Sequence, residues 1–137
     1  MASWNELQTE IAAHYRVVQE ENDDVVVAIL VGGARHMVHL RPAETDGDDE
    51  TVAIWTVIGR ETRFSLRAAL RYNLGARLGA VVIDGDNLVL RTTLPLTQID
   101  GALVRRAIDY TVAEAVRLTQ SGELDCEPAE MFGHLAE

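Results

Sequence analysis

The stretch VVVAILVGGARHMVHLR, residues 25–41, predicts a β-hairpin. Its first seven residues, 25–31, are a continuous run of apolar and mostly β-branched side chains, and a run of this length favours a strand over a helix. The pair Gly32–Gly33 suits a tight turn, because glycine adopts positive φ without steric cost. Residues 35–41 predict the returning strand. The hairpin therefore indicates an antiparallel sheet at the centre of the fold.

The flanking sequence predicts helices and further strands on both sides of this hairpin. Apolar side chains at helical spacing predict helices over residues 3–17, 64–74 and 100–119. Each apolar series follows a residue that suits a helix N-cap: Ser3, Ser65 or Asp100. The charged segment 20–24 is expected to be a turn. Period-two or continuous apolar runs predict strands over residues 51–58, 80–83 and 88–94.

This order predicts a two-layer α+β fold, α-β-β-β-α-β-β-α. We expect an antiparallel sheet of about five strands whose apolar face is covered by the three helices. A length of 137 residues corresponds to one domain. We assign residues 1–121 to that single domain and residues 122–137 to an acidic C-terminal tail.

The charge of the chain narrows the classes of partner. Twelve basic residues, all of them arginine, face 22 acidic residues, which gives a net charge of −10. Such a surface repels phosphate backbones and anionic lipid headgroups, so nucleic acid and membrane surfaces are not expected partners. No apolar run approaches the length that crosses a bilayer. The first residues have neither the basic start nor the apolar core of a secretory signal, so we expect a cytoplasmic protein.

The polar residues do not form a recognisable catalytic, cofactor-binding or metal-binding pattern. His36 and His39 are three apart on a predicted strand, so they point to opposite faces and cannot share one metal ion. Cys126 is the single cysteine and lies with His134 in the predicted tail, without the rigid support that a Cys–His nucleophile pair needs. The acidic loop 44–50 lacks the ligand spacing of a calcium loop. We therefore expect a protein that is not an enzyme and that has no cofactor.

Apolar side chains are predicted on both faces of the sheet, and the helices can cover only one. Val26, Trp55 and Val57 are the candidates for the uncovered face. A contiguous exposed apolar patch of several hundred Å² usually marks a protein contact, so these three residues are candidate partner-binding residues. The alternative is that another part of the chain covers them.

Several segments resemble those of one superfamily, the class I type III secretion chaperones (the CesT/Tir-chaperone type) and their YbjN-like relatives. The resemblance rests on the element order over residues 3–119 and on residues 70–74 (LRYNL), 78–91 (LGAVVIDGDNLVLR) and 94–96 (LPL), followed by a long helix. It implies a non-enzymatic homodimer joined through the middle helix. It also implies that apolar patches bind an extended segment of a partner protein. In this chain the residues expected at the dimer interface are Phe64, Leu66, Leu70 and Leu74.

Two other functions stay open at this point. A YbjN-like regulatory or adaptor protein could use its acidic surface to mask a basic partner, and such binding would weaken steeply with salt. A small-ligand-binding domain would need a pocket with converging polar groups, for which Arg91, His36 and Tyr72 are the candidates.

Overall fold

The computed structural model describes residues 3–21, 23–44, 50–76, 78–96 and 100–125 of the chain. The elements in chain order are α1 (Trp4–His14), β1 (Arg16–Glu21), β2 (Asp24–Val31), β3 (Ala34–Glu44), β4 (Glu50–Arg60), the 3₁₀ turn η1 (Glu61–Arg63), α2 (Leu66–Gly75), β5 (Ala80–Asp84), β6 (Asn87–Pro95) and α3 (Gly101–Ser121). The strands form one antiparallel sheet in the order β1-β2-β3-β4-β6-β5. The predicted α+β class and the α-β-β-β-α-β-β-α order are confirmed.

The sheet has six strands rather than about five, because residues 16–21 form an edge strand. We expected the first helix to continue to residue 17, but it ends at His14. Tyr15 holds the chain at this point, since its hydroxyl donates to the Arg105 carbonyl at 3.2 Å and to Asp109 Oδ1 at 2.9 Å. The chain beyond it pairs with β2, with Val17 opposite Val27.

The predicted helix caps at Ser65 and Asp100 and the predicted Gly32–Gly33 turn are confirmed. The Ser65 hydroxyl accepts a hydrogen bond from the Ala68 amide at 3.2 Å, and Asp100 Oδ1 accepts one from the Leu103 amide at 2.7 Å. Each contact satisfies a backbone donor that has no partner within its helix. The hairpin turn has positive φ at both Gly32 and Gly33, as a two-residue turn between twisted strands requires.

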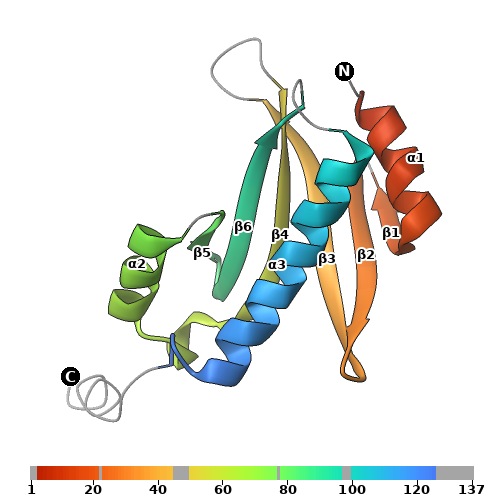
Figure 1. Ribbon diagram of the computed structural model, residues 1–137. Coiled ribbons are helices and arrows are strands. Elements are labelled where there is room, and N and C mark those ends of the chain that lie inside the picture. The colour runs from red at the N-terminus through yellow and green to blue at the C-terminus, as the bar shows by residue number, and fades with distance from the viewer. Residues whose placement is uncertain (1–2, 22, 45–49, 77, 97–99, 126–137) are drawn as a thin grey trace.

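The main core lies between one face of the sheet and the helices α1 and α3, which cross it (Figure 1). Helix residues such as Leu7, Ile11 and Ile108 pack there against strand residues such as Leu40 and Ile54, and all five are fully buried. A second cluster lies where α2 and the lower end of α3 meet β5 and β6. Its buried members are Phe64, Ala69, Val81, Leu88, Leu90, Ala115, Leu118 and Leu124.

The chain continues to pack against the domain after α3. Leu124 is fully buried in the second cluster, and its carbonyl accepts a hydrogen bond from the Ser65 amide at 2.7 Å. Asp125 forms a β-bridge with Phe64. Residues 122–125, which we assigned to the tail, therefore contact the folded domain. The rest of the predicted tail, 126–137, lies outside the described residues, as do Cys126, His134 and residues 45–49 of the acidic loop.

Candidate protein-binding surfaces

The outer face of α2 carries three exposed leucines in one row. Leu66, Leu70 and Leu74 are four residues apart, so they lie above one another along the helix. Leu70 is 70% exposed and Leu74 is 91% exposed. The face of α2 beside these leucines is used within the chain, where Ala69 is buried in the second cluster and Asn73 bonds to β5. We call Leu66, Leu70 and Leu74 the leucine row.

Phe64 does not belong to this surface, although we expected it at the dimer interface. Its ring is buried in the second cluster and lies against Gly59, where an added Cβ would be only 3.0 Å from the ring. Phe64 lies before the helix, in a segment that forms a β-bridge with Asp125. Its side chain points into the second cluster. It therefore anchors α2 to the domain from within the second cluster.

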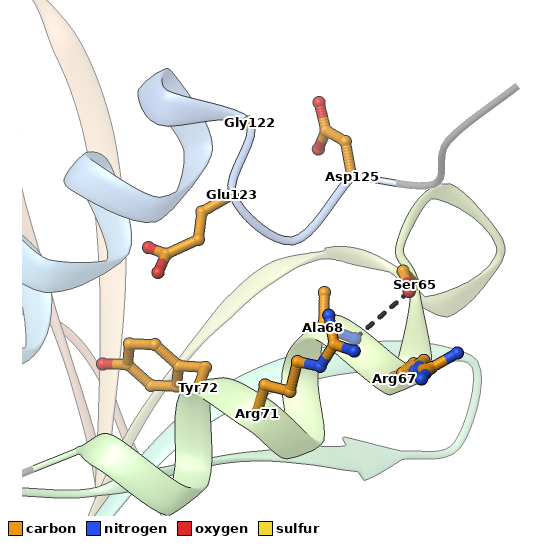
Figure 2. A pocket seen from close by; sticks show the side chains of 8 residues that line it. All are labelled: Ser65, Arg67, Ala68, Arg71, Tyr72, Gly122, Glu123 and Asp125. Atoms are coloured by element: carbon orange, nitrogen blue, oxygen red, sulfur yellow. Dashed lines mark hydrogen bonds between the residues drawn. The ribbon is translucent and has the colours of Figure 1, made fainter.

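A hollow of about 510 Å³ lies beside α2, under the segment that follows α3. Figure 2 shows Arg67, Arg71 and Tyr72 on the helix, with Glu123 and Asp125 on the segment above. The Tyr72 hydroxyl donates to Glu114 Oε1 at 2.9 Å. Burial, and then this hydrogen bond, raise the pKa of Tyr72 above its ordinary value.

The charges around this hollow are unevenly compensated. Arg117 bonds to Glu114 and, at 3.0 Å, to Glu123, and its contact holds the pKa of Glu114 below its usual range. Arg67 and Arg71 are exposed and take part in no ion pair within the described ranges. The leucine row therefore has a basic flank on the same helix.

The second candidate surface is the face of the sheet opposite α1 and α3. Trp55 on β4 is half-buried, and its neighbour in register on β3 is His39. The two rings stack with centroids 5.2 Å apart and an angle of 12° between their planes. The Arg41 guanidinium lies 5.6 Å from the indole centroid and is held by Asp24 through two hydrogen bonds of 2.7 Å. The indole is thus fixed in place by its neighbours on β3.

A hollow of about 340 Å³ adjoins Trp55 on this face; we call it the Trp55 hollow. Its lining residues are Arg41, Ala53, Trp55, Val82, Ile83, Asp84, Val89 and Arg91. Ala53 and Val89 are buried and give it a small apolar floor. Arg91 on β6 is directly opposite Trp55 in the strand register. The hollow therefore combines apolar surface, an indole and two guanidinium groups.

Of the three residues that we expected on this face to bind a partner, two are accessible. Val57 is 46% exposed and Trp55 is half-buried. Val26 is only 8% exposed, because it lies between Gln19 and His39 in register and its neighbours cover it. Sequence reasoning identified the face but not the hollow, since the register that places Arg91 beside Trp55 joins strands far apart in the chain.

The structure does not assemble the ligand pocket that we considered from Arg91, His36 and Tyr72. Arg91 lines the Trp55 hollow, whereas Tyr72 lines the hollow beside α2. His36 lies on the opposite face of β3 from Met37 and His39. This is the face that the helices cover, and His36 lines neither hollow. Among the described residues, no group of three His, Cys, Asp or Glu side chains is placed to hold a metal ion. No helix in those ranges is long and apolar enough to cross a membrane.

Comparison with known proteins identifies the fold. No protein-family model and no curated protein matches the sequence. Among solved structures, the chain matches the Yersinia pestis type III secretion chaperone SycH, which was crystallised in complex with a stable fragment of YscM2. The match covers 85% of this chain and 99% of that chain, with a TM-score of 0.59 and 19% sequence identity. The chain has the fold of this chaperone. The likeness agrees with the resemblance in sequence to the secretion-chaperone superfamily.

Proposed function

We propose that the protein is a non-enzymatic, chaperone-like binding module that acts as a homodimer and holds an extended apolar segment of a partner protein. The observation that carries the proposal is the sheet face opposite α1 and α3, where Val57 is exposed and Trp55 is half-buried. The fold supports it, because SycH has the same fold and binds a fragment of another protein. We expect this module to act in the cytoplasm.

The leucine row supports the homodimer. Three leucines in line on one helix form a more contiguous apolar surface than scattered single residues do. A second copy of the same helix would present the same row, so the two rows could pack against each other about a two-fold axis. Burying the row in a two-fold contact would remove each leucine from water at a gain of about 25 cal/mol per Å². Arg67 and Arg71 flank the row, which leaves their charges at the rim of the contact, where solvent reaches them.

Static light scattering of the purified protein tests the homodimer. We expect twice the chain mass at tens of micromolar protein. Leu70→Asp should give the monomer mass, because it would place an unpaired carboxylate in a desolvated contact. Leu30→Asp is the matched control, since Leu30 is 73% exposed at the β2–β3 hairpin, away from α2. A wild-type protein that is monomeric would contradict the homodimer, and a dimer that Leu70→Asp leaves intact would contradict the leucine row as its interface.

A basic partner masked by the acidic surface is the competing function, and salt separates the two. The net charge of −10 would attract a basic protein, and that attraction is screened beyond about 8 Å at physiological ionic strength. Apolar burial on the sheet face responds only weakly to salt. We therefore expect partner affinity to change little between low and moderate salt.

A further inference from the structure

The Trp55 hollow has a fixed aromatic wall next to Arg91, which forms no ion pair with the residues that the structure describes. In the strand register, His39, Trp55 and Arg91 form one row across β3, β4 and β6. The His39 ring stacks on the Trp55 indole from one side and holds it in place. Arg91 is the neighbour of Trp55 on the other side and lines the hollow. The floor beneath is apolar, because Ala53 and Val89 are buried there.

The charged groups around the hollow differ in whether they already form an ion pair within the described part of the chain. Arg41 already forms an ion pair with Asp24, and the charge of Asp84, which also lines the hollow, contributes to the raised pKa of Arg41. Burial lowers the pKa of the His39 imidazole, which favours its neutral form. Arg91 is exposed and forms no ion pair with any described residue. It is thus the guanidinium in this hollow that is free to bind an anion.

An arginine beside an apolar floor can bind a carboxylate from a segment that places an apolar side chain on the same face. In an extended segment, residues two apart point the same way and lie about 7 Å apart. One side chain can then cover the Trp55 edge and the floor while the other reaches Arg91. Arginine binds carboxylates through two parallel N–H donors, which fixes the register as well as the charge preference.

We propose that the Trp55 hollow selects an acidic residue placed two positions from an apolar residue in the partner's extended segment, with Arg91 as the carboxylate-binding group. This inference rests on the proposed function and specifies the chemistry of the partner. It assigns a function to Arg91, which has no ion-pair partner in the described part of this acidic chain. It also predicts that the partner is recognised by a local acidic and apolar pattern, and not by basic charge.

The test is a fluorescence titration of the full chain with short blocked peptides. In a Trp4→Phe background, Trp55 is the only tryptophan, so its emission reports on the hollow. One probe has leucine and glutamate two positions apart, in the repeat Leu-Ser-Glu-Ser, and its matched probe has lysine in place of each glutamate. We expect the glutamate peptide to bind about fivefold more tightly than the lysine peptide. Arg91→Gln should abolish this preference, whereas Arg106→Gln on the exposed side of α3 should leave it unchanged.

The outcomes separate this inference from the proposed function. If both peptides bind equally, or if the preference survives Arg91→Gln, the acidic selection is wrong while apolar binding on this face stands. If neither peptide changes Trp55 emission or binds by calorimetry, the inference is wrong, and crosslinking from the same face then decides the proposed function separately. A preference for the lysine peptide would overturn the inference and favour a basic partner.

Discussion

The side-chain amide of Asn73 on α2 closes the free edge of β5 through two hydrogen bonds to Val81. Asn73 Oδ1 accepts from the Val81 amide at 2.7 Å, and Asn73 Nδ2 donates to the Val81 carbonyl at 2.9 Å. An amide side chain thereby takes the place of a neighbouring strand. Because unpaired strand edges pair readily with other chains, α2 both docks onto the sheet and blocks strand addition at this residue.

Replacing Asn73 with alanine should weaken this end of the molecule. Asn73→Ala leaves one backbone donor and one acceptor of a buried residue unpaired, which we expect to lower the free energy of unfolding by about 1–3 kcal/mol. Urea unfolding followed by circular dichroism measures the change. Asn5→Ala, on the exposed side of α1, is the control and should change stability little. Equal stability of Asn73→Ala and wild type would show that the two hydrogen bonds do not hold α2.

The packing of Leu124 predicts that the domain extends beyond α3. Leu124→Ala removes a fully buried side chain from the second cluster and should cost about 2–5 kcal/mol of unfolding free energy. Leu30→Ala, at an exposed leucine, should cost almost nothing. Thermal or urea unfolding of the two variants gives the comparison. If Leu124→Ala unfolds like wild type, residues 122–125 belong to the tail as the sequence first suggested.

His39 predicts a pH dependence of stability near neutrality. Burial lowers the pKa of His39 most, Asp24 opposes the shift, and Arg41 adds to it. Because the folded-state pKa is below the unfolded value of about 6.5, the unfolded state takes up the proton first as pH falls. The contribution of His39 is therefore present above pH 6.5 and is lost as pH decreases through the folded-state pKa.

Urea unfolding at pH 7.5 and pH 5.5 measures this dependence. We expect the wild type to lose stability over the interval and His39→Gln to lose less, since glutamine does not titrate. The carboxylates titrate mainly below this range, so they affect both proteins alike. An identical loss in the two proteins would show that the imidazole does not contribute through its protonation.

Local signals in the sequence were sufficient for the hairpin and the helix caps. Gly32 and Gly33 mark a turn whose geometry depends on only two residues, and Ser65 and Asp100 cap helices through contacts three residues away. The edge strand β1 gave no such signal. Only Val17 in it is partly buried, so its side chains show no alternation between apolar and polar.

The candidate surfaces were predictable to the extent that they depend on one element. The leucine row follows from helical spacing alone. Phe64 and Val26 are more buried than expected. Phe64 is covered by a distant part of the chain, Leu124 and Asp125, whereas Val26 is covered by its neighbours in the strand register, Gln19 and His39. The placement of Arg91 opposite Trp55 likewise depends on which strands are neighbours, and β4 pairs with β6 rather than with β5.

The most direct test of the central claim is photo-crosslinking from the open face of the sheet inside cells that make the protein. Val57 replaced by benzoylphenylalanine should crosslink to an extended, apolar segment of one partner protein, identified by mass spectrometry. Adding Trp55→Ala should abolish the product, and the same photoreactive residue at the exposed position Ala113 on α3 should give none. Crosslinking that is equal from both positions, or absent from position 57, would contradict the account.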